Sequence, residues 1–100
     1  MGQTTLAGVE LRDFQDLMTR TYGTRDTARG LPASVAWLVE EVGELAQAIR
    51  KGDDEARLHE LGDVLAWLAS IAAQLGLSLE QAADRYHDGC PGCGAVPCRC

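Results

Sequence analysis

The sequence predicts an all-α protein, a bundle of about four helices followed by a short, irregular, cysteine-rich tail. Two observations favour this fold class. Apolar residues recur at helical spacing through most of the 100 residues, and no run alternates with period two over a useful length. The tail, GCPGCGAVPCRC, contains too much glycine and proline for regular structure.

The first predicted helix covers about residues 9–21. Its apolar side chains at helical spacing are Leu11, Phe14, Leu17 and Met18. The segment YGTRDTARGLP then interrupts the pattern with two glycines and Pro32. We therefore expect this helix to end near Thr21.

The second and third predicted helices are defined by their boundary residues. Proline suits a first helical turn, so Pro32 marks the start of the second helix, and Gly52 is its glycine C-cap. Asp53 or Asp54 can cap the third helix, which runs until Gly76. The connection between the two helices is short, so we expect them to pack antiparallel as a hairpin.

The fourth predicted helix starts at Ser78, and Gln81 three residues later gives the spacing of a capping box. A chain of 100 residues has room for one hydrophobic core. We therefore expect one helical domain over residues 1–88 and a cysteine-rich tail over residues 89–100.

Composition and charge argue against a nucleic-acid-binding, secreted or membrane-spanning protein. The formal net charge of −6 argues against binding of nucleic-acid polymers, which relies on clustered lysine and arginine. The N-terminal segment lacks the basic and apolar regions of a secretory signal, and no stretch has the roughly 18 apolar residues of a membrane span. The expected protein is cytoplasmic, without contact to a membrane.

Each helix of the predicted hairpin carries an apolar stripe with a pair of acids beside it. The stripe of the second helix consists of Leu38, Val42, Leu45 and Ile49. The stripe of the third helix consists of Leu61, Val64, Leu65, Leu68, Ile71, Ala72 and Leu75. Glu41 and Glu44 flank the first stripe, and Glu60 and Asp63 flank the second.

Antiparallel packing should bring these two acidic pairs to the same height, because each pair lies eight to eleven residues from Gly52. The two acids of each pair are three residues apart on a helix, and like charges at that spacing repel one another unless a cation lies between them. Carboxylates without histidine or cysteine suit magnesium, or manganese, rather than zinc. The alternative is that the acids are solvated surface charges, which is the more common role of a single such pair.

The acids also carry a family resemblance. EEVGE at residues 40–44 followed by ELGD at residues 60–63 resembles the EExxE…ExxD signature of the MazG-like nucleotide pyrophosphohydrolases, an all-α superfamily of magnesium-dependent enzymes. The resemblance extends over about residues 11–86. It implies that Glu41, Glu44, Glu60 and Asp63 bind the metal. Glu40 is the remaining acid of the motif, and the resemblance implies a catalytic role for Glu40 and Glu41 in activating water.

The family reaction cleaves a nucleoside triphosphate between the α and β phosphorus atoms to a monophosphate and pyrophosphate. By resemblance, we expect this activity on a ribo- or deoxyribonucleotide, with clearing of non-standard nucleotides as a role. Related proteins form dimers or tetramers, so we expect a homodimer or homotetramer. The rival functions are a phosphoribosyl-ATP pyrophosphohydrolase and a non-catalytic regulatory module that binds metal or nucleotide.

Three other residues are candidates for substrate binding. Trp37 and Trp67 share the acidic flank and can stack on a base, or they can seal the core or a subunit interface. Lys51, near the hairpin turn, can contact phosphates or complement the helix dipole. His59 falls off the acidic flank, and we expect it to be a surface residue.

The tail contains all four cysteines of the chain, spaced C-x₂-C-x₄-C-x-C. They are Cys90, Cys93, Cys98 and Cys100. Four thiolates can bind zinc tetrahedrally, and the neighbouring glycines and prolines permit close turns. Disulfides and free redox-active thiols are the alternatives.

Overall fold

The structure, a computed structural model, describes residues 9–100. Its helices are α1 (Leu11–Arg29), α2 (Leu31–Lys51), α3 (Asp54–Gln74) and α4 (Leu79–Asp84). The described residues contain no strand, and the predicted all-α fold class with its irregular tail is confirmed. None of these four helices combines the length and apolarity needed to cross a membrane. The predicted domain of residues 1–88 begins with residues 1–8, which lie outside the described part.

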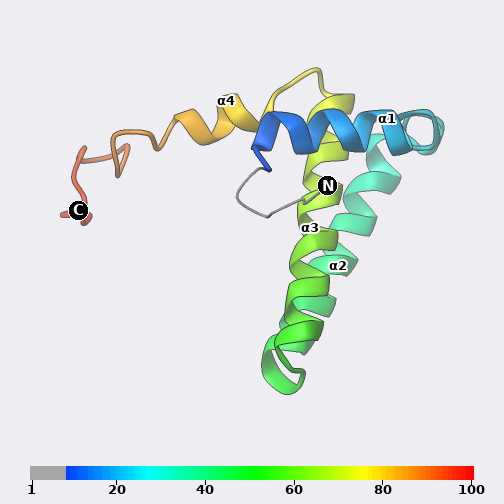
Figure 1. The fold of residues 1–100 in the computed structure, drawn as a ribbon, viewed down its shortest axis with the longest axis horizontal. Helices are drawn as coiled ribbons and strands as arrows, with labels where there is room; N and C mark the ends of the chain where they lie inside the picture. The colour runs from blue at the N-terminus through cyan, green and yellow to red at the C-terminus, as the bar shows by residue number, and fades with distance from the viewer. Residues whose placement is uncertain (1–8) are drawn as a thin grey trace.

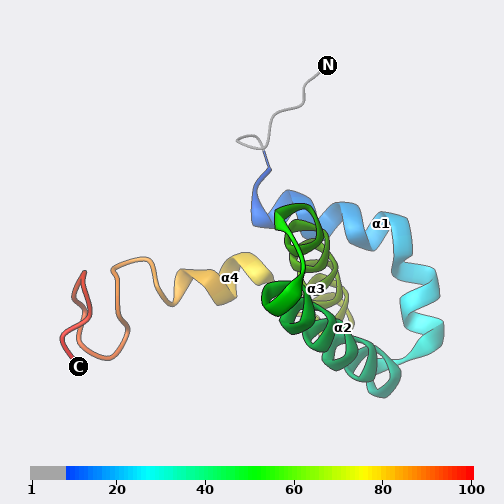
Figure 2. The same cartoon turned by 90° about the horizontal axis from the view of Figure 1, so that it is seen from below.

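Helices α2 and α3 form a long antiparallel hairpin (Figure 1). Helix α1 crosses the end of the hairpin opposite to its turn and packs mainly on α3. Helix α4 then leads the chain away from the hairpin into the tail, as Figure 2 also shows. The hairpin is therefore the part of the fold that sets the distance between the acids of α2 and α3.

Side chains fix both sides of the hairpin turn. Asp53 caps α3 by accepting a hydrogen bond from the backbone N–H of Ala56 at 2.9 Å, as one of the two predicted caps. Arg57 donates from Nε to the carbonyl of Ala48 at 3.1 Å and from Nη2 to that of Ile49 at 3.0 Å. These carbonyls belong to the last turns of α2, so Arg57 ties the start of α3 to the end of α2.

Helix α1 is longer than the sequence predicted. The predicted end near Thr21 is wrong, because the helix continues through Gly23 to Arg29. One interior glycine costs a helix only about 1 kcal/mol, which packing against a neighbouring helix can offset. The end of α1 is set by Gly30, whose φ of 88° lies in a region that L-residues rarely adopt. The last turns of α1 thereby reach the acidic side of the hairpin.

The other end of α1 is tied to the α3–α4 connection. The Gln15 side chain donates to the carbonyl of Leu77 at 2.9 Å and accepts from the backbone N–H of Leu79 at 2.8 Å. The predicted cap of α4 is present, since Ser78 accepts from the backbone N–H of Gln81 at 3.2 Å. These bonds fix the position of α1 across α3.

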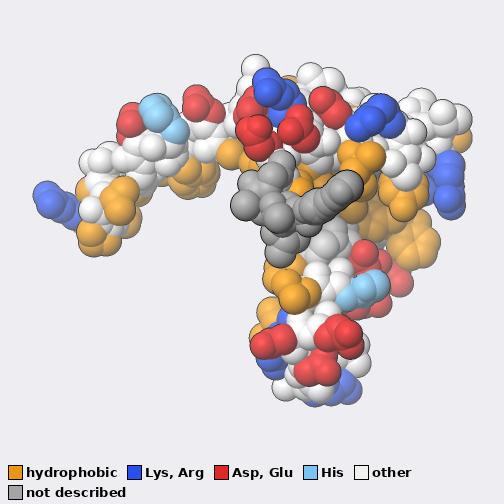
Figure 3. Space-filling model, viewed as in Figure 1, with side chains coloured by type: hydrophobic (Ala, Val, Ile, Leu, Met, Phe, Trp, Pro, Cys, Tyr) orange, Lys and Arg blue, Asp and Glu red, His pale blue; other side chains and the backbone are white. Residues whose placement is uncertain are grey.

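The core of the single chain is small. Among residues 9–100, the buried apolar residues are Ala48, Ala69 and Ala72. Parts of both predicted apolar stripes are exposed instead of buried: Val42 is 48% exposed and Leu61 is 52% exposed. Figure 3 shows hydrophobic side chains at the surface over the hairpin. The predicted stripes do lie on helices, but a single chain buries fewer of their side chains than the sequence predicted.

Candidate functional site

Carboxylates from both helices of the hairpin gather in one cluster. Glu41 and Glu44 of α2 and Glu60 of α3 each present an oxygen, and these three oxygens lie within 4.8 Å of one another. Glu60 also belongs to a second group with Asp63 and His59, whose ligand atoms likewise lie within 4.8 Å of one another. Glu60 therefore links the acidic pair of α2 to that of α3. We call Glu41, Glu44, Glu60 and Asp63 the acidic cluster.

Two oxygens of the acidic cluster are buried without a hydrogen-bond partner. They are Oε2 of Glu41 and Oε1 of Glu60, one from each helix. A buried carboxylate oxygen without a partner is costly, and a divalent cation bound between the helices would remove the cost. Oxygen-only carboxylate ligands at this spacing fit magnesium or manganese. The residues present therefore fit the metal that the sequence predicted.

The electrostatics of the acidic cluster point the same way. Burial, together with the negative charges of Glu44, Asp63 and Glu60, raises the pKa of Glu41 from 4.5 to about 7. Without a cation, Glu41 is therefore largely protonated below neutral pH. A bound cation would reverse this preference, because it neutralises the charges that oppose ionisation.

His59 lies closer to the acids than its sequence position predicted. Its side chain is exposed, as expected, but Nε2 lies 3.3 Å from Oδ2 of Asp63. The two residues are four apart on α3, a spacing that brings side chains together on one helical face. The prediction that His59 lies off the acidic flank is therefore wrong.

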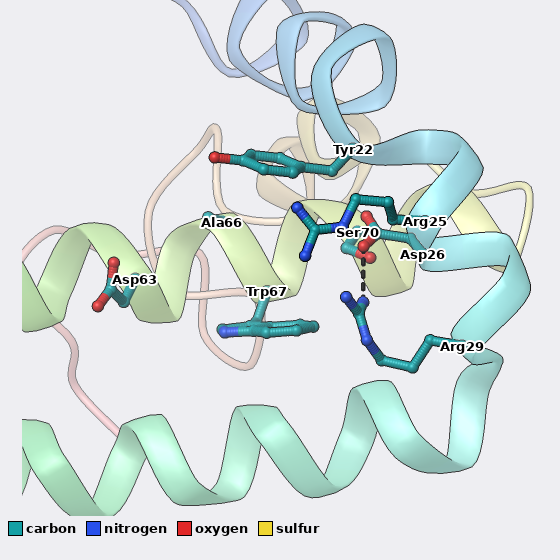
Figure 4. A pocket seen from close by; sticks show the side chains of 8 residues that line it. All are labelled: Tyr22, Arg25, Asp26, Arg29, Asp63, Ala66, Trp67 and Ser70. Carbon is teal, nitrogen blue, oxygen red and sulfur yellow. Dashed lines mark hydrogen bonds and ion pairs between the residues drawn. The ribbon is translucent and has the colours of Figure 1, made fainter.

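A cavity of about 250 Å³ opens beside the acidic cluster, between α1 and α3. Its lining residues are Tyr22, Arg25, Asp26, Arg29, Asp63, Ala66, Trp67 and Ser70. Figure 4 shows the rings of Tyr22 and Trp67 on facing sides of this space, with Asp63 toward one end and the two arginines toward the other. The cavity thus combines aromatic faces, cationic groups and one carboxylate of the cluster.

Trp67 contacts two neighbouring side chains, Arg29 and Trp37. The guanidinium of Arg29 lies 4.8 Å from the centre of the Trp67 ring, and Arg29 is itself held by Asp26 at 2.7 Å. The Trp37 ring is parallel to Trp67 to within 5°, with ring centres 6.0 Å apart. Trp37 packs against Trp67 and is 45% exposed. Of the two tryptophans predicted to bind substrate, Trp67 lines this cavity and Trp37 does not.

On the other side of the cluster lies a more open hollow of about 330 Å³. It is lined by Glu44, Gln47, Ala48, Lys51, Gly52 and Glu60. Lys51 therefore lies near two of the acids. Glu40 is exposed and belongs to neither group of candidate metal ligands, so its catalytic role stays a prediction.

Residues 30–88 match the MazG nucleotide pyrophosphohydrolase domain. The chain belongs to this family. Proteins of the MazG family generally hydrolyse pyrophosphate bonds of nucleotides, typically with a divalent metal. The MazG match contains the whole acidic cluster, both tryptophans and Lys51. The chain is also similar to a Bacillus subtilis (strain 168) protein called "Uncharacterized protein YpjD", with 43% identity over 86 residues that cover 75% of this chain and 78% of that protein.

The MazG match begins at residue 30, so the residues that α1 adds to the cavity precede it. Tyr22, Arg25 and Arg29 were not predicted as site residues, because the first helix was expected to end near Thr21. Their signal was their spacing: residues three and four apart on a helix lie on one face. These residues share a helical face only because Gly23 lies inside α1 and does not end it.

The four cysteines of the tail form a second candidate metal site. Their Sγ atoms all lie within 4.8 Å of one another, and none forms a disulfide. Hydrogen bonds from the backbone N–H groups of Arg99 and Ala95 lower the pKa of Cys93 from 9.0 to about 6. Backbone N–H groups of Cys93 and Gly92 lower the pKa of Cys90. The tail can thus present thiolates, the form in which cysteine binds metals.

Proposed function

We propose that this MazG domain is a magnesium-dependent nucleoside triphosphate pyrophosphohydrolase, with manganese as a substitute. The observation that supports it most is the pair of buried carboxylate oxygens without partners, Oε2 of Glu41 and Oε1 of Glu60, which belong to one cluster but to different helices. The cavity and the hollow on the two sides of the acids supply room for a nucleotide. Membership of the family supplies the reaction class.

In the proposed reaction, the oxygen of a water forms a bond to the α phosphorus, and the bond from that phosphorus to the α–β bridging oxygen breaks. The products are a nucleoside monophosphate and pyrophosphate. Magnesium, when bound by the acidic cluster, neutralises phosphate charge and lowers the pKa of a bound water. Of the two predicted catalytic acids, Glu41 lies within the cluster, so we assign to it the proton that water loses. We retain Glu40 as an acid that orients water from outside the cluster.

We assign the nucleoside to the cavity, with its base between Tyr22 and Trp67, because aromatic faces stack on any base. Arg25 can then approach ribose or phosphate oxygens, while Arg29 stays paired with Asp26. We assign the leaving pyrophosphate to the side of Lys51, whose ammonium suits phosphate oxygens. This placement puts the α phosphorus next to the acids that lie between the cavity and the hollow.

We also propose a homodimer or homotetramer as the active form. Large apolar side chains on the outer faces of α2 and α3 support it, among them Val39, 65% exposed, and Ile49, 57% exposed. Apolar surface of this kind on a hairpin with a three-alanine core is typical of a subunit interface. Because nucleoside triphosphates are made and used in the cytoplasm, we assign the protein to that compartment and to clearing non-standard nucleotides.

A panel of standard and base-modified triphosphates, with phosphoribosyl-ATP beside them, tests this function. Pyrophosphate release should require magnesium or manganese. In water labelled with oxygen-18, the label should appear in the monophosphate, because water attacks the α phosphorus. Label in pyrophosphate would contradict the proposed bond cleavage. Turnover of phosphoribosyl-ATP alone would favour that enzyme, and tight nucleotide binding without any turnover would favour the non-catalytic module.

A further inference from the structure

We propose that the tail binds one zinc ion through Cys90, Cys93, Cys98 and Cys100, in a closed site that folds the tail and takes no part in hydrolysis. The sequence left zinc, disulfides and free thiols open. Four features of the structure support a separate zinc site. They are the spacing of the sulfurs, the backbone around them, the exposure of the tail and its place in the fold. None of them depends on the acidic cluster.

The spacing of the sulfurs fits a tetrahedral ion. Sγ of Cys90 lies 3.5 Å from Sγ of Cys98 and 3.8 Å from Sγ of Cys100. Four sulfurs bound tetrahedrally at about 2.3 Å from a zinc ion lie about 3.8 Å from one another. The cysteines are free rather than paired. Their positions therefore surround one point, as ligands of a single ion do.

The backbone around the cysteines is arranged to hold thiolates. The backbone N–H of Arg99 donates to Sγ of Cys93 at 3.3 Å, and that of Cys100 donates to Sγ of Cys98 at 3.4 Å. Gly94 has a φ of 72°, which permits the chain to reverse directly after Cys93. Such N–H donors offset the negative charge of metal-bound thiolates, much as hydrogen bonds around other metal sites tune their ligands.

The surroundings of the cysteines supply little apolar packing. Most residues from 89 to 100 are exposed, so burial cannot account for their close approach. A segment this short needs a metal or a covalent crosslink to hold a fixed shape. Four thiolates in a tetrahedron favour zinc or iron, and a set of four protein ligands leaves no open position for a substrate.

The tail also lies apart from the acidic cluster within the chain. Figure 1 and Figure 2 both show it at the far end of α4, away from the α2–α3 hairpin. The two candidate sites differ in ligand chemistry, with carboxylate oxygens at one and thiolates at the other. Their preferences for magnesium and zinc should therefore be independent.

Elemental analysis of the full-length protein, purified under reducing conditions without added metal, tests the proposal. We expect about one zinc per chain, lost in Cys93→Ser and in Cys98→Ser. Glu41→Gln is the matched control and should keep its zinc. Cobalt substituted for zinc should give the absorption bands of tetrahedral thiolate coordination. Iron in place of zinc, or no bound metal with four titratable thiols or two disulfides, would overturn the proposal.

Activity separates this inference from the proposed function. Both cysteine variants should retain pyrophosphate release with magnesium if the wild-type protein has it. Zinc in a protein that hydrolyses no nucleotide would support the tail site and contradict the hydrolase. Loss of hydrolysis in both cysteine variants, at unchanged helical content, would contradict the statement that the zinc site takes no part in hydrolysis.

Discussion

Replacing Glu41 by glutamine should stabilise the metal-free protein while removing its response to magnesium. The pKa of Glu41 is raised from 4.5 to about 7, so ionising this residue costs more in the folded state than in the unfolded state. At about 1.4 kcal/mol per pKa unit, the difference corresponds to roughly 3 kcal/mol. Solvent screens a partly exposed cluster, so we expect about 1–2 kcal/mol in practice.

The sign of the pH dependence follows from proton binding. Between pH 4.5 and about pH 7 the folded state holds more protons on Glu41 than the unfolded state does. The free energy of unfolding of the metal-free wild type should therefore fall, relative to that of Glu41→Gln, as the pH rises through this range. At pH 8 the variant should be more stable by the full 1–2 kcal/mol. Near pH 4.5 the two proteins should differ little.

Urea unfolding followed by circular dichroism, at equal protein concentrations, measures this difference. The samples are wild type, Glu41→Gln and the control Glu40→Gln, each in chelator or in magnesium, at pH 5 and pH 8. Glu40 is exposed and lies outside the cluster, so its substitution should leave the wild-type pH dependence unchanged. Magnesium should stabilise the wild type and have little effect on Glu41→Gln. Two results would contradict this prediction. One is a Glu41→Gln variant no more stable than wild type in chelator at pH 8, and the other is a magnesium stabilisation of the variant equal to that of wild type.

Three further predictions concern the cluster, the cavity and the interface. Asp63→Asn should lower kcat at least 100-fold at unchanged helical content, and near-native turnover would remove Asp63 from the site. Trp67→Ala should raise KM by about 10-fold, as expected for about 1–3 kcal/mol of lost base stacking; an unchanged KM for every nucleotide would place the base elsewhere. Leu61→Glu should reduce the oligomer mass measured by light scattering, because an apolar side chain contributes about 1.5–3 kcal/mol when buried. An oligomer of unchanged mass would show that Leu61 lies outside the interface.

Local signals in the sequence predicted most of the helix boundaries. Asp53 and Ser78 cap their helices because their side chains bond to backbone N–H groups only a few residues away. The end of α1 was mispredicted at Thr21. The sequence shows a glycine at position 23, but the contacts of α1 with α3 that make the longer helix favourable are tertiary.

The same distinction applies to the candidate site. Glu41 and Glu60 lie in one cluster, as the sequence predicted. Helical periodicity gives the face of each helix on which the acid lies, and antiparallel packing gives its height along the hairpin. The cavity with Tyr22 depends on where α1 crosses α3, which local spacing does not specify. The exposed Val42 and Leu61 show a further limit, because a sequence pattern marks an apolar face without saying whether the same chain or another subunit covers it.

The most direct test of a shared metal site is a crystal structure grown in manganese, with the ion located by its anomalous scattering. We expect a manganese ion about 2.0–2.3 Å from carboxylate oxygens of both helices, with Glu41 and Glu60 among its ligands. Manganese bound only elsewhere, with the acids of α2 and α3 facing separate solvent, would contradict the account.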